Sequence, residues 1–207
     1  MNPLRLLTEK PWQNPPQTAG GVYVPASQRS VVPPQKVALL FFIAVVGVMF
    51  GLFITAYFIR MDLDDWRPMP EVALLWLNTA VLFLASLVLQ WTHNALKRGE
   101  SRHLRSGLLL GALLSAGFVT GQYLVWRQMS AAGYQVYENP ANAFFYVLTG
   151  IHALHLFGGL LVWLRACYRI ATGSAPERIR LAVELCALYW HFLLLVWLVL
   201  FALISYT

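Results

Sequence analysis

Five long stretches of apolar side chains constrain the fold of this chain more than any other feature. They cover Val37–Ile59, Val72–Trp91, Ser106–Trp126, Phe144–Leu164 and Leu185–Tyr206. About 20 residues of helix, rising about 1.5 Å each, cross a hydrocarbon core about 30 Å thick. Backbone groups in lipid must be paired within the segment, so each stretch is predicted to be a helix. The predicted fold class is all-α, a polytopic membrane protein of five transmembrane helices.

Composition supports the same fold class. Hydrophobic residues make up 58% of the chain and charged residues 12%, whereas soluble domains carry about 25% charged residues. A soluble fold could not cover so much apolar surface. The first 36 residues differ from the rest, because they are polar and hold seven of the eleven prolines. We therefore expect residues 1–36 to form an extended tail and residues 37–207 to form one membrane domain.

Basic residues are distributed unevenly between the predicted connections, and their distribution predicts the orientation. Only Arg60, Arg67 and Arg127 lie on the side that also carries most of the acidic residues. The other twelve basic residues share the opposite side: Arg5, Lys10, Arg29, Lys36, Lys97, Arg98, Arg102, Arg105, Arg165, Arg169, Arg178 and Arg180. Basic loops stay in the cytoplasm, so the N-terminus and its tail are predicted inside and the C-terminus outside. The positive charge thus serves topology, and no nucleic-acid partner is expected.

The two cysteines, Cys167 and Cys186, have no CxxC spacing and fall near the predicted cytoplasmic side. Since the cytoplasm is reducing, we expect free thiols.

Small residues recur every four positions in two of the predicted helices. One series is Gly47 and Gly51, and the others are Gly107, Gly111 and Ser115, and Gly117 and Gly121. Such spacing lets helix backbones approach closely in lipid. Both helices are therefore expected to pack tightly on a neighbour.

Three histidines lie within the predicted spans, and histidine serves both as a metal or haem ligand and as an interhelical hydrogen-bonding group. They are His152, His155 and His191, of which the last two have similar predicted depth and could face each other. A cytochrome with two haems needs four such ligands, so hydrogen bonding is the favoured interpretation. The spans also lack the carboxylate clusters that line ion pathways.

The last two helices carry the most specific motifs. They read FFYVLTGIHALHLFGG at Phe144–Gly159 and ELCALYWHFLLLVWLVLF at Glu184–Phe201. This pattern resembles subunit III of haem-copper cytochrome c and quinol oxidases, in its bacterial form with five helices. The resemblance extends back through Leu74–Leu104 and assigns a structural polar and aromatic motif: Thr149, His152, His155, Glu184, Tyr189, Trp190, His191 and Trp197.

The resemblance implies a non-catalytic subunit of a terminal oxidase in the bacterial cytoplasmic membrane. Such a subunit binds no haem or copper, which other subunits hold, so no catalytic, cofactor-binding or metal residue is expected here. It packs against the catalytic subunit I, retains phospholipids in a cleft between helices, and supports proton uptake and resistance to inactivation during turnover. Arg169 matches a family arginine that contacts a lipid phosphate, although an arginine at this position could also only set topology.

The sequence departs from the family at three positions where many relatives have a carboxylate. This chain has Val45, Val125 and Leu194 there. Valine and leucine cannot relay a proton, so a relay through these positions is not expected. Glu184 matches a family glutamate, and it is expected to be hydrated or paired with a loop arginine.

Two other functions remain open at this point. A subunit III-like protein that accompanies nitric oxide reductases could share the histidine motifs. A small transporter or channel is a third possibility, but the chain shows neither intramembrane charge clusters nor an inverted repeat.

Overall fold

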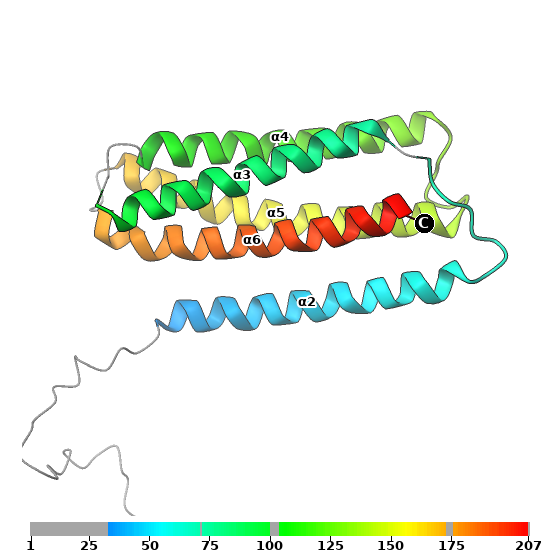
Figure 1. Cartoon of the computed structure of the whole chain (residues 1–207), viewed down its shortest axis with the longest axis horizontal. Coiled ribbons are helices and arrows are strands. Elements are labelled where there is room, and N and C mark those ends of the chain that lie inside the picture. Colours follow the sequence, from blue (N-terminus) through cyan, green and yellow to red (C-terminus); the bar gives the residue numbers. More distant parts are fainter. Residues whose placement is uncertain (1–32, 71, 100–103, 173–175, 207) are drawn as a thin grey trace, which may run out of the picture. The chain divides into compact units, whose positions relative to one another are not determined.

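A computed structural model describes residues 33–70, 72–99, 104–172 and 176–206. Within these ranges the chain is helical, with turns and short connections and no strand. The tail predicted for residues 1–36 lies outside them except at its end, where the first described helix has already begun. The helices are α2 (Pro34–Met61), α3 (Ala73–Lys97), α4 (Leu104–Ala131), α5 (Pro140–Ala171) and α6 (Pro176–Tyr206) (Figure 1).

The all-α fold class is confirmed. All five helices among the described residues are long and apolar enough to cross a membrane. Each is longer than the stretch predicted for it, and α5 is the clearest case, since it starts at Pro140 and ends at Ala171. Hydropathy marks only the part of a helix that lies in hydrocarbon, whereas hydrogen bonding continues through the polar residues at both membrane surfaces.

Proline and glycine mark the helix ends. Three helices have proline at their first position, where the missing N–H would have no helical acceptor in any case. Before α5, the Asn139 side chain accepts a hydrogen bond from the Ala141 N–H, as a helix cap does. After α3 and α4, Gly99 and Gly133 have φ of 80° and 94°, the left-handed conformation that ends helices and favours glycine.

Helices α3 to α6 form a bundle whose core is crossed by indole hydrogen bonds. The Trp197 Nε1 donates to Thr79 Oγ1 at 2.9 Å, which joins α6 to α3. The Trp190 Nε1 donates to Ser115 Oγ at 3.1 Å, which joins α6 to α4. The Trp163 Nε1 donates to the Leu108 carbonyl oxygen at 3.2 Å and joins α5 to α4. These bonds satisfy the only polar side-chain atom of each buried tryptophan and fix the rotation of each helix about its axis.

Gly107, Gly111 and Gly121 of α4 pack as closely as predicted, whereas the glycines of α2 have no close neighbour in the described chain. A Cβ added at Gly111 would lie 2.7 Å from Cη2 of Trp163. On α2, a Cβ at Gly47 would meet nothing nearer than 3.9 Å, and one at Gly51 would meet nothing within 4 Å. These glycines of α2 therefore have no close neighbour within the described chain, and the spacing of small residues does not distinguish contacts within a chain from contacts with a partner.

The contacts of α2 with the bundle are made mainly by aromatic side chains. The Phe50 ring lies 5.8 Å from the ring of His155, and Tyr57 packs edge-on against Phe144 at 5.4 Å, as measured between ring centroids. An ion pair between Lys36 and Glu184 adds one polar contact. The backbone of α2 has few close approaches to the other helices.

Candidate functional site

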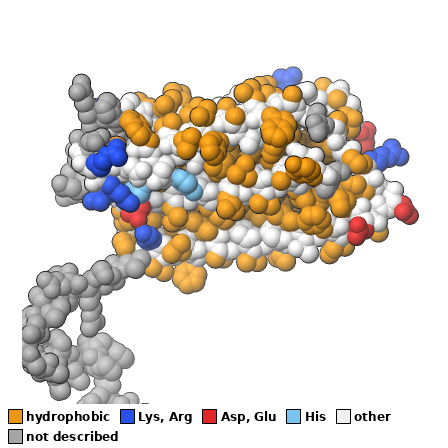
Figure 2. All heavy atoms as spheres, in the orientation of Figure 1, with side chains coloured by type: hydrophobic (Ala, Val, Ile, Leu, Met, Phe, Trp, Pro, Cys, Tyr) orange, Lys and Arg blue, Asp and Glu red, His pale blue; other side chains and the backbone are white. Residues whose placement is uncertain are grey.

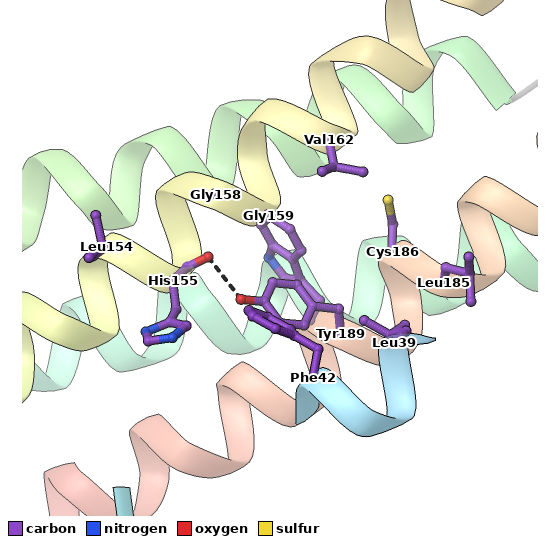
Figure 3. Close-up of a pocket in the computed structure, with 11 residues that line it drawn as sticks. Leu39, Phe42, Leu154, His155, Gly158, Gly159, Val162, Leu185, Cys186 and Tyr189 are labelled. Carbon is purple, nitrogen blue, oxygen red and sulfur yellow. Dashed lines mark hydrogen bonds between the residues drawn. The ribbon is translucent and has the colours of Figure 1, made fainter. Parts of the chain in front are cut away.

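A cavity of about 430 Å³ lies between α2, α5 and α6 (Figure 3). This volume lies within the range of about 300–1,000 Å³ that is usual for small-molecule sites. The walls are almost entirely apolar, and they are formed by Leu39, Phe42, Leu154, His155, Gly158, Gly159, Val162, Leu185, Cys186, Tyr189 and Trp190. The cavity can therefore hold an apolar chain and offers almost no polar group to a charged ligand.

Two adjacent glycines of α5 shape the cavity in different ways. A Cβ at Gly159 would lie 2.7 Å from Cε1 of Tyr189 and 2.8 Å from Cζ3 of Trp190, so α6 packs directly on this position. A Cβ at Gly158 would meet nothing within 4 Å, so this position opens onto free space. Phe42 of α2 closes the opposite side by packing on the Tyr189 ring at 5.9 Å.

The Tyr189 side chain connects the two helices that form the cavity wall. Its hydroxyl donates a hydrogen bond to the backbone carbonyl oxygen of His155 at 3.0 Å (Figure 3). The carbonyl would otherwise serve only the helix, so the bond satisfies the phenol without interrupting α5. Tyr189 is 8% exposed, and its motif position therefore has a structural role.

His155 and His191 do not face each other, although their similar depth would allow it. The Nδ1 of His155 bonds the Ile151 carbonyl oxygen of its own helix at 2.8 Å, and its ring packs beside α2. The Nδ1 of His191 likewise bonds Ala187 of its own helix, and the His191 side chain is exposed. Similar depth was predictable from residue counting, but the face that each ring occupies depends on helix rotation of about 100° per residue.

His152 is fully buried, and neither of its ring nitrogens has a hydrogen-bond partner in the described part of the chain. Aromatic rings surround it. The centroid distances are 5.1 Å to Trp197, 5.9 Å to Phe118 and 6.4 Å to Phe50. No described residue makes the hydrogen bond between helices that was predicted for His152, and the ring instead packs against aromatic rings.

The remaining motif residues hold helices together. Thr149 accepts a hydrogen bond from the Trp126 Nε1 at 3.0 Å and donates one to the Phe145 carbonyl oxygen at 2.6 Å. Trp190 and Trp197 make the bonds to α4 and α3 described above. Thr149, Trp190 and Trp197 are fully buried, so this part of the motif belongs to the bundle core.

Glu184 pairs with a partner that the sequence did not suggest. Its Oε1 lies 2.7 Å from Nζ of Lys36, near the start of α2, and no loop arginine bonds it among the described residues. The Glu184 side chain is 33% exposed, which agrees with the expected hydrated glutamate, and its ion pair is with a lysine of α2. The two residues are 148 positions apart, so no local pattern could have revealed the pair.

Arg169 lies near the end of α5 and is exposed. It follows Val162, which lines the cavity, by seven residues, or almost two helical turns. Both residues therefore lie on the same side of α5, with Arg169 about 10 Å farther along the helix axis. Arg178, by contrast, lies where the structure does not describe side chains.

The three positions that lack the family carboxylate have different environments. Val45 is 67% exposed on α2, whereas Val125 and Leu194 are 0% and 8% exposed in the bundle. A carboxylate at Val45 would face outward and one at Val125 would be buried among helices. The three valine and leucine side chains can neither donate nor accept a proton in either environment.

No group of three or more His, Cys, Asp or Glu residues in the described ranges could hold a metal ion. Cys167 and Cys186 are free thiols, as predicted. The resemblance implied a lipid cleft between helices but did not place it, and Phe42 and Gly158 were not identified as lining residues. A local signal was the glycine pair at Gly158 and Gly159, which small-residue spacing does not distinguish from ordinary helix packing.

Known proteins with similar sequences identify the family of this chain. The family model of cytochrome c oxidase subunit III matches residues 30–207. A cytochrome c oxidase subunit 3 from Thermostichus vulcanus is 31% identical over 171 residues, or 80% of this chain and 84% of the relative. One from Synechocystis sp. is 33% identical over 172 residues, covering 80% of this chain and 72% of the relative. The chain therefore belongs to the cytochrome c oxidase subunit III family, the accessory subunits of haem-copper oxidases.

Proposed function

We propose that this chain stabilises the catalytic subunit of its oxidase and retains a phospholipid, one acyl chain of which occupies the cavity between α2, α5 and α6. The observation that carries the proposal is the apolar cavity itself. A cavity of about 430 Å³ with hydrocarbon walls matches a hydrocarbon chain and no charged substrate. Membership of the family favours this role over a nitric oxide reductase accessory protein or a transporter.

Arg169 provides the complementary group for the lipid headgroup. It lies on the cavity side of α5, about 10 Å beyond Val162, which is a suitable separation between an acyl chain and its phosphate. A guanidinium presents several N–H donors in a planar fork that suits phosphate oxygens. We therefore assign Arg169 as the phosphate contact and the cavity as the site of the chain.

The orientation that the basic residues predict is consistent with this assignment. With the N-terminus inside, Arg169 and Lys36 lie at the cytoplasmic surface of a bacterial inner membrane, where anionic headgroups attract basic side chains. The haem and copper of the complex belong to partner subunits in this proposal. The role of this chain is to hold lipid and protein together beside the catalytic subunit.

Filling the cavity tests the proposal. Gly158→Leu would place a side chain in the cavity, where a Cβ meets nothing within 4 Å. Gly51→Leu is a matched control, because its Cβ is equally unobstructed but lies outside the cavity lining. We expect the purified Gly158→Leu oxidase to lose about one tightly bound phospholipid per complex, measured by mass spectrometry, and to inactivate faster during turnover. Equal lipid content in wild type and both variants would refute the proposal.

A further inference from the structure

The outward surface formed by α3 and α6 differs from the other outward surfaces of the bundle. The two helices are adjacent, since the ring of Trp76 packs on that of Phe201 at 4.7 Å. Stepping seven residues along each helix keeps to one side, which places Phe83 and Gln90 with Trp76. The equivalent line on α6 contains Leu198 and His191, flanked by Leu188 and Leu195. These residues form the α3–α6 face.

Most of the α3–α6 face is ordinary membrane-facing surface. Phe83 is 49% exposed and Leu195 is 60% exposed. In Figure 2, where α3 and α6 lie toward the viewer, histidine side chains interrupt the apolar surface near its basic end. His155 and His191 each bond a carbonyl oxygen of their own helix. His191 is exposed, whereas His155 is half-buried.

The hydrogen bond of His191 defines which nitrogen remains available. The Ala187 carbonyl oxygen can only accept, so Nδ1 of the neutral imidazole must carry the proton and donate. The Nε2 atom is then a bare acceptor, and no described residue of this chain donates to it. Gln90, on the same face, uses Nε2 to bond Asn94 at 3.1 Å, and its carbonyl oxygen makes no bond within the described chain.

Membrane depth excludes the usual partners of such an acceptor. His191 lies seven residues beyond Glu184, which is the last charged residue of α6, and therefore about 10 Å deeper. Bulk water and phosphate headgroups are absent at that depth of the hydrocarbon core, and a polar group left unpaired there carries a substantial energetic cost. Polar residues within spans accordingly face protein or a water-filled cavity.

The outward surfaces of α4 and α5 provide the contrast. From Leu109 to Leu124 on α4, the exposed polar side chains are Thr120, whose hydroxyl donates to Ala116 of its own helix, and the interfacial Tyr123. From Val147 to Leu164 on α5, the exposed side chains are apolar, and the half-buried His155 packs beside α2. These two outward surfaces suit lipid along their whole length, whereas the α3–α6 face is interrupted by the exposed His191.

We propose that the α3–α6 face is the surface through which this chain binds a transmembrane helix of another oxidase subunit, one that donates a hydrogen bond to Nε2 of His191. The inference rests on membership of an oxidase complex. The partner helix carries a donor, such as a hydroxyl, amide or indole N–H, at the depth of His191. Its flanking residues are apolar, to match Leu195 and Phe83.

Photochemical crosslinking in the native complex tests the location of this face. A benzoylphenylalanine introduced at Leu195 should form an adduct with a protein subunit of the oxidase. The same group at Leu113, which is 69% exposed on α4, should capture lipid. The proposal is overturned if Leu195 yields only lipid or a second copy of this chain, or if Leu113 alone captures the partner subunit.

Substitution of His191 tests the hydrogen bond. One interhelical hydrogen bond in a membrane raises the association constant of the two helices by about three- to twentyfold. We expect His191→Phe to weaken retention of the partner subunit in detergent by this factor, and His191→Gln, which keeps an acceptor, to restore most of it. Equal retention in wild type and His191→Phe would contradict the assignment, because phenylalanine is the better residue for lipid.

Membership of the oxidase complex and the location of the docking face can be tested separately. Purification of the unmodified chain with haem-containing subunits tests membership of the complex. If the wild-type chain brings down no haem protein, the proposed function fails. If it does so while Leu195 yields only lipid, membership stands and the docking face is wrong.

Discussion

Nζ of Lys36 lies 2.7 Å from Oε1 of Glu184 and joins the N-terminal parts of α2 and α6. The side chains are 36% and 33% exposed, so solvent screens the pair and its stabilisation is small, about 0.5 kcal/mol. The ion pair helps to position α2, because the other contacts of this helix with the bundle are mainly aromatic.

Reversing the charges tests this ion pair. Lys36→Glu alone would place two carboxylates together and lower the thermal unfolding midpoint of the purified chain. The double variant Lys36→Glu with Glu184→Lys should restore most of the loss. If the change in midpoint of the double variant equals the sum of the changes in the two single variants, the pair contributes nothing.

Replacement of His152 by phenylalanine should raise the free energy of unfolding. The imidazole is fully buried and has no hydrogen-bond partner among the described residues, and burial of an unpaired polar group costs about 1–3 kcal/mol. His152→Phe fits the aromatic surroundings and is expected to raise the free energy of unfolding by about 1 kcal/mol. As a control of opposite sign, Thr149→Val leaves the indole N–H of Trp126 unpaired and should lower it. A destabilised His152→Phe variant would reveal a partner for this histidine in the assembled protein.

Arg169→Ala tests the assigned phosphate contact. Because Arg169 is exposed, its loss should leave assembly and initial turnover nearly unchanged while lowering the count of retained phospholipid. The oxidase should then lose activity faster with cumulative turnovers. Arg165→Ala, which removes the same charge one turn earlier, serves as the control. Equal lipid counts and inactivation curves for the two variants would reduce Arg169 to a residue that sets topology.

The loop after α2 contains a pH-dependent contact. Arg60 donates through Nη1 to Oδ1 of Asp65 at 2.6 Å, and this hydrogen bond holds the pKa of the Asp65 carboxyl below its usual value. Because the pKa is lowered in the folded protein, the contact stabilises the loop fully above the ordinary pKa. The stabilisation is lost as the pH falls through the lowered value. In a carboxyl NMR titration, Arg60→Gln should raise the pKa of Asp65 toward its usual range, and Arg67→Gln should not.

Cysteine labelling tests the orientation. In a variant without Cys167 and Cys186, a cysteine at Tyr137, which is 86% exposed, should react with an impermeant maleimide added outside intact spheroplasts. A cysteine at Thr172 should react only after the membrane is opened. Labelling of both from the same side would be incompatible with an odd number of membrane crossings between them.

The sequence predicted the helices well, because every residue in a lipid-spanning helix contributes to the hydropathy signal. It could not predict which face each residue occupies. His155 and His191 have similar depth, yet one lies beside the cavity and the other points outward, because each helix is rotated by its own packing contacts. The tryptophan bonds to Thr79 and Ser115 fix that rotation, and each depends on residues far apart in the chain.

The cavity likewise could not be located from the sequence. The family motif identified residues that are buried in the bundle, such as Thr149 and Trp197, but the cavity depends on the position of α2. That position rests on Phe42, Phe50 and Lys36, none of which has a distinctive local pattern. Tertiary placement of one helix therefore determined what the motif alone did not.

The loose attachment of α2 has a consequence for assembly. Synthesis proceeds from the N-terminus, so α2 enters the bilayer before any helix on which it packs has been made. The indole bonds among α3, α4, α5 and α6 can form without it, whereas its own contacts with His155 and Glu184 require α5 and α6. Among the described helices, the first to be inserted is thus the last to dock, and a lipid molecule already present between α2 and the bundle can be enclosed as α2 docks.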